Sequence, residues 1–293
     1  MFKLNQYSFS NFKIAFILAI LSYFFVYGFE ITHFTLSIDE EPLDNFFQTL
    51  SAGRWGHALL RHYVLPEPYV PFFTTAFSLL VLSISAAFCA TYLSLNKLQS
   101  AAFVIMLAAM PQFAYQLEFS NQADTVSLAF LCSVLSLFML ESFNLARYAI
   151  FIILTILCLS VYQSIFLFAA TLLCVKLTID SLQEKINFKD VFKRIIIFGA
   201  LVLISLVINS FLSKWIASFY NVQISSYLSS MIGWGKRDIY SIFKSVLFFI
   251  RDCLAFKYAY GMNSFPFALL WLLGIILLAV KRKKTPCWCH LWR

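Results

Sequence analysis

Charged side chains are scarce in this sequence. Asp, Glu, Lys and Arg make up only 12% of the 293 residues, whereas 61% of the residues are hydrophobic. A soluble domain has about 25% charged residues, so the composition excludes an ordinary soluble globular protein. Apolar runs of about 17 to 25 residues recur, and in lipid each run must satisfy its own backbone hydrogen bonds. The sequence therefore predicts an all-α polytopic transmembrane helical bundle.

The sequence also lacks the motifs of several other protein classes. It contains no P-loop, no dinucleotide-binding glycine loop and no nucleic-acid motif. The net charge of +8 therefore does not indicate a nucleic-acid partner. Its basic residues largely cluster at the ends of apolar runs, which is the pattern that sets membrane topology.

The cysteines predict neither a disulfide framework nor a metal site. Cys89, Cys132, Cys158 and Cys174 fall inside apolar runs, where cysteine behaves as a small hydrophobic residue. The C-terminal sequence CWCH at 287–290 has two cysteines and one histidine but no second ligand pair. We expect no metal bound there.

The apolar runs predict about eight spans in one transmembrane domain, residues 1–293. The first is retained rather than cleaved, because no small-residue cleavage site follows it. We place the spans at 12–29, 72–95, two within 101–141, two within 148–180, 195–212 and 265–280. The stretch 148–180 could also be one long tilted helix. Two short helices that turn at Tyr162-Gln163-Ser164 keep the basic clusters on both sides of it in the cytoplasm.

This topology puts both termini in the cytoplasm and two long loops outside, at about 30–70 and 213–264. The first loop contains a catalytic candidate, the acidic stretch IDEEPLD at 38–44. Pro42 suits the first position of a short helix that runs to about Leu50. Gly53 ends that helix, and GHALLRHYVL at 56–65 forms a second short amphipathic piece in the membrane interface.

Three interpretations remain open for the acidic cluster, which comprises Asp39, Glu40, Glu41 and Asp44. The carboxylates could cap the short helix and complement its dipole. One of them could act as a general base, since crowded like charges raise some of their pKa values. They could instead hold a divalent cation against a phosphate.

Further candidate substrate contacts lie later in the first outer loop and in other outer segments. Arg54 suits a phosphate or the carboxylates of the acidic cluster, and Trp55 suits a sugar ring, although both residue types also anchor proteins at the headgroups. Tyr162 and Gln163 lie at the expected turn between two short helices. A polar turn also explains the presence of these residues without any role in binding. Lys236 and Arg237 in the second outer loop would either anchor that loop or contact an anionic lipid phosphate.

The order of these motifs resembles a known family. IDEEPLD, GRWGHALL, PFFTTAFSLL, MPQFAYQLEF and VYQSIF, in this order over about residues 12–175, resemble serotype-converting O-antigen glucosyltransferases of the Gtr type. The resemblance implies a GT-C-like transferase that moves glucose from undecaprenyl-phosphate to O-antigen on the periplasmic face of the bacterial inner membrane. It also implies a catalytic carboxylate in the first loop, at Asp39 or Glu40, without choosing between them.

Two other functions remain as alternatives. A transporter or lipid flippase of the cell-envelope polysaccharide pathway would place charged sites near the membrane midplane. An O-antigen polymerase would also act outside, but on two large lipid-linked glycans. The spans are nearly free of charge and the polar residues gather outside, which favours an interfacial enzyme. Its expected partners are the lipid-linked sugar donor, the O-antigen acceptor and membrane lipids.

Overall fold

The computed structural model describes residues 6–33, 45–66, 70–225, 238–254, 258–259, 262–263 and 273–274. The chain divides into two compact units, Met1–Ser225 and Ser226–Arg293.

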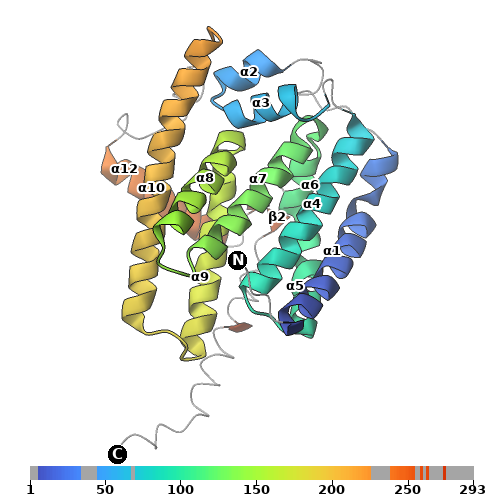
Figure 1. Cartoon of the computed structure of the whole chain (residues 1–293), viewed down its shortest axis with the longest axis vertical. Coiled ribbons are helices and arrows are strands. Elements are labelled where there is room, and N and C mark those ends of the chain that lie inside the picture. Colours follow the sequence, from blue (N-terminus) through green and yellow to red (C-terminus); the bar gives the residue numbers. More distant parts are fainter. Residues whose placement is uncertain are drawn as a thin grey trace, which may run out of the picture. The chain divides into compact units, whose positions relative to one another are not determined.

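The first unit is a helical bundle (Figure 1). Its elements are α1 (Gln6–Thr32), α2 (Phe46–Ser51), α3 (Trp55–Tyr63), α4 (Pro71–Tyr92), α5 (Lys97–Ala108), α6 (Pro111–Leu117), α7 (Ser120–Met139), α8 (Leu145–Val161), the 3-10 turn η2 (Gln163–Ile165), α9 (Phe166–Leu182) and α10 (Phe188–Phe219).

Helix α4 is central to this bundle. It packs between α1 and α7, α7 packs on α8, and α8 packs on α10. Ala86, Ala87 and Ala90 of α4 are buried and let neighbouring helices approach closely. Hydroxyl groups along α4 donate to carbonyl oxygens one turn earlier, as Ser78 does to Thr74 at 2.6 Å and Ser83 to Leu79 at 2.6 Å. The helix thus satisfies its polar side chains internally, as burial in lipid requires.

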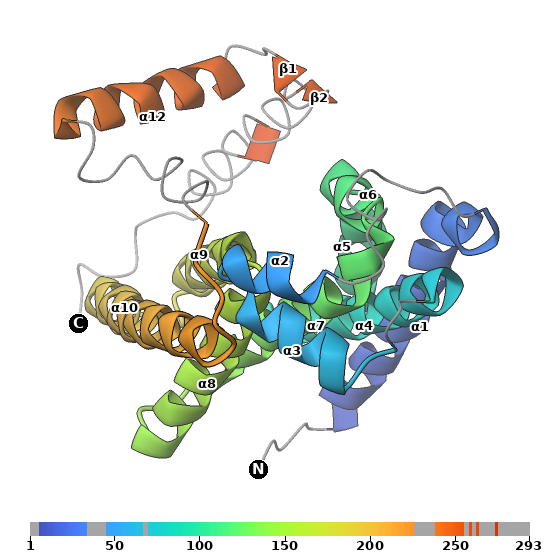
Figure 2. The same ribbon diagram turned by 90° about the horizontal axis from the view of Figure 1, so that it is seen from above.

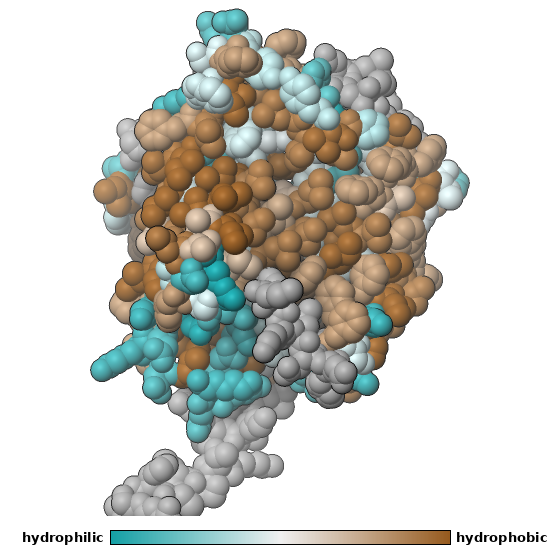
Figure 3. Space-filling model, in the orientation of Figure 1, coloured by the Kyte–Doolittle hydropathy of each residue, from teal (hydrophilic) through white to brown (hydrophobic). Residues whose placement is uncertain are grey.

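Among the described residues, five helices are long and apolar enough to cross a membrane. They are Phe9–Thr32, Pro71–Tyr92, Ser120–Met139, Gln163–Leu182 and Phe188–Phe219. The space-filling view shows apolar side chains over the middle of the helices, with hydrophilic ones gathered at the end opposite α2 and α3 (Figure 3). The protein is therefore a multi-pass membrane protein.

The predicted break in the stretch 148–180 is confirmed. Helix α8 ends at Val161, Tyr162 is extended, and α9 begins at Phe166. The first of the two helices predicted within 101–141 is shorter than expected, because α5 has only 12 residues. The predicted last span, 265–280, lies outside the described residues except for positions 273 and 274.

Helix α10 is longer than predicted. It extends from Phe188 to Phe219, whereas the sequence predicted a span that ends at Leu212. Lys214 does not end it, because the next turn buries Ile216 against α2 and α3. Tertiary packing therefore continues the helix into the region predicted as a loop.

The second unit also contains structure where a loop was predicted. Helix α12 (Ile239–Leu254) begins where the Asp238 carboxylate accepts the backbone N–H of Ser241 at 3.1 Å. Lys244 and Arg251 both lie over the Phe248 ring. Strands β1 (Tyr258–Ala259) and β2 (Met262–Asn263) pair antiparallel, with Tyr258 opposite Asn263 (Figure 2).

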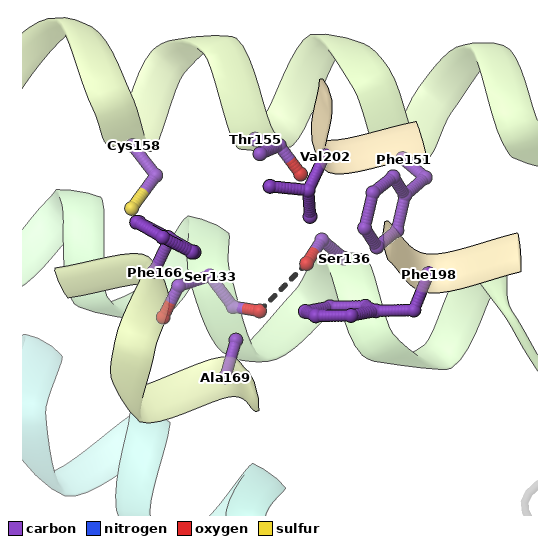
Figure 4. A pocket seen from close by; sticks show the side chains of 9 residues that line it. All are labelled: Ser133, Ser136, Phe151, Thr155, Cys158, Phe166, Ala169, Phe198 and Val202. Carbon is purple, nitrogen blue, oxygen red and sulfur yellow. Dashed lines mark hydrogen bonds between the residues drawn. The ribbon is translucent and has the colours of Figure 1, made fainter. Parts of the chain in front are cut away.

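A cavity inside the bundle is too small to be a substrate site. It has a volume of about 10 Å³, which is about the space of one water molecule. Thr155 lines it, and its hydroxyl oxygen has no hydrogen-bond partner among the described residues (Figure 4). The other lining side chains are Ser133, Ser136, Phe151, Cys158, Phe166, Ala169, Phe198 and Val202. A larger polar arrangement lies at the α3 end of the bundle.

Candidate active site

The candidate site lies where α2 and α3 cross the ends of the longer helices (Figures 1 and 2). The α3 face that contacts the bundle contains Gly56, His57, Ala58 and Arg61, all buried. The spacing of His57, Ala58 and Arg61 puts them on one face of a helix. Helix α3 thus docks through a partly polar face, so each buried polar group needs a partner.

Arg61 is the strongest anchor of α3. Its Nη2 lies 2.6 Å from Asp124 Oδ1 and 2.6 Å from the carbonyl oxygen of Asn121, and its Nη1 donates to the Pro66 carbonyl oxygen at 3.2 Å. Arg61 is 7% exposed and Asp124 is 0% exposed. The Arg61–Asp124 ion pair therefore joins α3 to the first turns of α7 in a buried environment, where neither charge is stable alone.

His57 makes the second polar contact between α3 and α7. Its Nδ1 lies 2.7 Å from Thr125 Oγ1, and the Thr125 hydroxyl donates to the Gln122 carbonyl oxygen at 2.9 Å. Both contacts are satisfied when His57 Nδ1 carries the proton. Burial, and then the positive charges of Arg61 and Arg54, lower the pKa of His57 to about 3. The ring is therefore neutral near pH 7.

Gly56 sets how closely α3 approaches α8. A Cβ at this position would lie 2.7 Å from Ser160 Cβ, 3.1 Å from the Ser160 carbonyl carbon and closer still to Ser160 Oγ. Two of these contacts are far inside van der Waals distance. Only glycine fits between α3 and α8 in this arrangement.

The two substrate-binding candidates at the start of α3 make contacts with separate helices. Arg54 Nη1 donates to Gln122 Oε1 at 3.3 Å, and the guanidinium lies 4.6 Å from the centre of the Tyr162 ring. Trp55 Nε1 donates to Asn209 Oδ1 of α10 at 3.0 Å. Among the described residues, no carboxylate lies within ion-pair distance of Arg54. Arg54 thus presents an oriented positive charge that is half-buried.

The structure brings together some of the predicted site residues. Arg54 and Tyr162, proposed from separate motifs, contact each other through a cation–π interaction. Gln163 is exposed in the 3-10 turn beside them. The remaining predicted site residues lie outside the described residues and stay predictions: Asp39, Glu40, Glu41, Asp44, Lys236 and Arg237.

No metal centre is found in the described part of the chain. Among those residues, no three or more His, Cys, Asp or Glu side chains form a group that could hold a metal ion. The acidic cluster and the CWCH tail fall outside that search.

The pairing of Arg61 with Asp124 was not predicted, although the sequence contains a signal for it. Asp124 lies in the first turns of α7, which begins at Ser120, and its carboxylate accepts a hydrogen bond from Arg61 of α3. An ionisable residue within an apolar run demands a named partner. Arg61 lies in the last turn of a helix whose polar residues recur at helical spacing, so that partner could have been proposed.

Comparison with known proteins adds the family. A family model described as glucosyl transferase GtrII matches residues 28–288, most of the chain. The protein belongs to the GtrII glucosyl transferase family. This confirms the family predicted from the order of the motifs, and it makes the protein a glycosyltransferase. No curated protein and no solved structure matches the chain.

The fit of Gly56 can be tested in this GtrII-family protein. Gly56→Ala forces a methyl group into Ser160, and overpacking of this kind costs about 1–3 kcal/mol in the free energy of unfolding. Ser160→Gly in the same chain removes two of the three close atoms and is expected to restore part of the loss. Unfolding titrations in detergent measure both changes.

The matched control for this test is Gly28→Ala. A Cβ at Gly28 meets no atom within 4 Å, so this variant is expected to be as stable as the wild type. Equal losses for Gly28→Ala and Gly56→Ala would contradict the close fit of α3 on α8.

The Arg61–Asp124 ion pair predicts strong coupling between its members. Asp124→Leu and Arg61→Met each leave one charge buried without its partner, and each is expected to lower the free energy of unfolding by about 3–5 kcal/mol. The double variant Arg61→Met/Asp124→Leu removes both charges and is expected to recover most of that loss. A double-mutant cycle from unfolding titrations measures the coupling, and additive single and double effects would rule it out.

The low pKa of His57 predicts a pH dependence of stability. An unfolded chain binds a proton at His57 near pH 6.5, whereas the folded chain does so only near pH 3. The free energy of unfolding therefore falls as pH falls from about 6.5 toward 3. Between pH 7 and 4.5 the wild type should lose roughly 2 kcal/mol more than His57→Asn, which keeps an amide near the Nδ1 position. Equal pH profiles for both proteins would count against a neutral, buried His57.

Proposed function

We propose that this GtrII-family protein transfers glucose from undecaprenyl-phosphate-glucose to lipid-linked O-antigen. The reaction takes place on the periplasmic face of the bacterial inner membrane, in a GT-C-like bundle of about eight spans. The family supports glucosyl transfer, and the multi-pass bundle supports a donor that is carried by a membrane lipid. The absence of a nucleotide-binding glycine loop in the sequence is consistent with a donor without a nucleotide.

The observation that carries the proposal is the placement of Arg54. Its guanidinium is oriented by Gln122 and by the Tyr162 ring, and no described carboxylate neutralises it. A guanidinium forms paired hydrogen bonds with phosphate oxygens, which stabilises the charge that collects on a departing phosphate. Arg54 therefore binds the donor phosphate at the membrane interface, with Lys236 and Arg237 as further cations and Trp55 beside the sugar.

The acidic cluster supplies the base in this proposal. Asp39 or Glu40 takes the proton of the acceptor hydroxyl while the acceptor oxygen bonds to the anomeric carbon. The bond from the anomeric carbon to the phosphate oxygen breaks, and undecaprenyl phosphate leaves with the electron pair. Glu41 and Asp44 support the base or hold a divalent cation against the phosphate. Tyr162 and Gln163 complete the donor site, and the configuration at the anomeric carbon is inverted.

The arrangement of charge favours an enzyme over a transporter. The Arg54, His57 and Arg61 contacts lie at one end of the bundle, where α3 crosses α7 and α8. A transporter or lipid flippase would bind its substrate near the midplane of its spans. An O-antigen polymerase would add whole repeat units, whereas the reaction proposed here adds one hexose to each repeat.

The reaction can be tested with purified protein in lipid nanodiscs, with polyprenyl-phosphate-glucose and O-antigen as substrates. Asp39→Asn or Glu40→Gln is expected to lower kcat by about 10²–10⁴, the usual contribution of a general base. Arg54→Gln is expected to lower kcat/KM for the donor by about 10- to 100-fold, since it removes hydrogen bonds to a charged group. Arg54→Lys keeps the charge without the planar fork, so its kcat/KM for the donor should lie between that of the wild type and that of Arg54→Gln.

The control is Lys176→Gln, which removes a charge from α9 that bonds to Ser94, just after the end of α4 that is remote from α3. It should leave the transfer rate unchanged. Mass spectrometry of the product must show one added hexose for each repeat. Wild-type rates in Asp39→Asn, Glu40→Gln and Arg54→Gln together would refute the proposed site.

A further inference from the structure

An exposed group of aromatic side chains lies beside the candidate site and takes no part in the contacts described above. We call it the aromatic shelf and define it by Tyr63 of α3, Trp215 and Phe219 of α10, and Tyr220 directly after α10. Tyr63, Trp215 and Phe219 are 66%, 67% and 71% exposed. Large exposed apolar groups that adjoin each other mark interaction surfaces rather than ordinary protein surface.

The four rings form a continuous row. The Trp215 and Phe219 ring centres are 6.3 Å apart, and those of Phe219 and Tyr220 are 5.2 Å apart. The Tyr220 hydroxyl lies 3.0 Å from the Tyr63 hydroxyl, which joins α10 to α3. The row thus combines apolar ring faces with a pair of hydroxyl groups that can donate and accept hydrogen bonds.

The shelf has a firm support. Beneath it, Phe46, Leu50, Ala58 and Ile216 form a hydrophobic cluster of their own, separate from the main core of the bundle. The Phe46 ring packs edge-on against Tyr220 at 5.0 Å between centres. Trp55 packs against the same cluster as Tyr220, so this cluster links the shelf to the proposed donor site.

The length of α10 puts the shelf beyond the hydrocarbon layer. The helix has basic residues near its start, and the apolar stretch 195–213 that follows is about 28 Å long at 1.5 Å per residue. The hydrocarbon core of a bilayer is about 30 Å thick, so Lys214 marks its outer boundary. Trp215, Phe219 and Tyr220 follow that boundary, which puts them at the level of the headgroups and the water beyond.

Sugars match this surface better than lipid tails do. The C–H groups on one face of a sugar ring stack on the negative face of an aromatic ring, and its hydroxyl groups bond with tyrosine hydroxyls. A lipid tail would leave the Tyr63 and Tyr220 hydroxyls in an apolar contact. Tyr220 of the shelf and Trp55, the neighbour of Arg54, pack against the same cluster, so the shelf lies close to the candidate site.

We propose that the aromatic shelf binds sugar rings of the acceptor polysaccharide and directs the chain toward the site at Arg54. This inference rests on the proposed function, in which the acceptor is a polysaccharide. It adds a binding site that holds rings of the acceptor away from the reacting hydroxyl, and so it determines which acceptor chains are used.

The test uses the full-length protein in nanodiscs and O-antigen polysaccharide freed of its lipid. Trp215→Ala/Phe219→Ala is expected to raise KM for this acceptor at least tenfold, with KM for the donor and kcat at saturating acceptor unchanged within twofold. Saturation-transfer NMR without donor should show the same loss in affinity for the polysaccharide. Trp215→Phe/Phe219→Tyr keeps the ring faces and should restore binding.

The matched control is Phe25→Ala/Phe29→Ala on α1, which removes two exposed rings at the same spacing, 91% and 63% exposed. It should change neither KM nor polysaccharide binding. Wild-type acceptor KM and affinity in the Trp215 and Phe219 variant would overturn the proposal. An equal loss in both double variants would also overturn it, because the rings would then act as lipid anchors.

The same measurements separate this inference from the proposed function. If the wild type binds the polysaccharide but transfers no glucose to it, the proposed reaction fails and the shelf remains a glycan-binding surface. If the shelf variant transfers glucose with an unchanged acceptor KM, the shelf proposal fails and the reaction stands.

Discussion

The arrangement of the candidate site depends on one constraint, that a buried charge must have a partner. Arg61 and Asp124 satisfy it for each other across the boundary between α3 and α7. Because Arg61 also bonds to backbone carbonyl groups of Asn121 and Pro66, the pair fixes both the end of α3 and the chain that follows it. Arg54 lies two turns earlier on the same short helix. The Arg61–Asp124 pair therefore helps to position Arg54 over the Tyr162 ring, although Arg54 takes no part in that pair.

The two faces of the site differ in how they are held. Toward the bundle, α3 is fixed by His57, Arg61 and the glycine contact at Gly56, none of which can be exchanged for a larger or unpaired group. Toward α10, α2 and α3 pack through the small cluster around Phe46 and Ile216. A short helix of nine residues would be marginal alone, so tertiary contacts on both sides account for its presence. This is the rigid support that a transfer reaction at an interface requires.

Sequence patterns predicted much of this fold. Hydrophobic runs located α1, α4, α7 and α10, and the polar residues at Tyr162 located the break between α8 and α9. The Gly53 turn between α2 and α3 was predicted too, and its φ of +73° shows why glycine suits it. The pairing of Arg61 with Asp124 was not predicted, because hydropathy does not show which residues of separate segments meet. The last turns of α10 were not predicted, because Lys214 suggested the end of a span, whereas Ile216 packs on α2 and α3 and continues the helix. Helix α12 was not predicted either, because it lies in a stretch rich in basic residues that predicted a loop. The catalytic role of the acidic cluster remains a prediction.

The hydrogen bond between Trp55 and Asn209 has a consequence for the orientation of α10. An asparagine amide that faces lipid has no partner, so rotation of α10 by one residue, about 100°, would strand a polar group in hydrocarbon. The Asn209 side chain therefore favours one rotation of α10 about its own axis. Ile216, two turns further on, then faces the protein, and its neighbour Trp215 faces outward. One amide within the membrane thus determines which rings the far end of α10 displays.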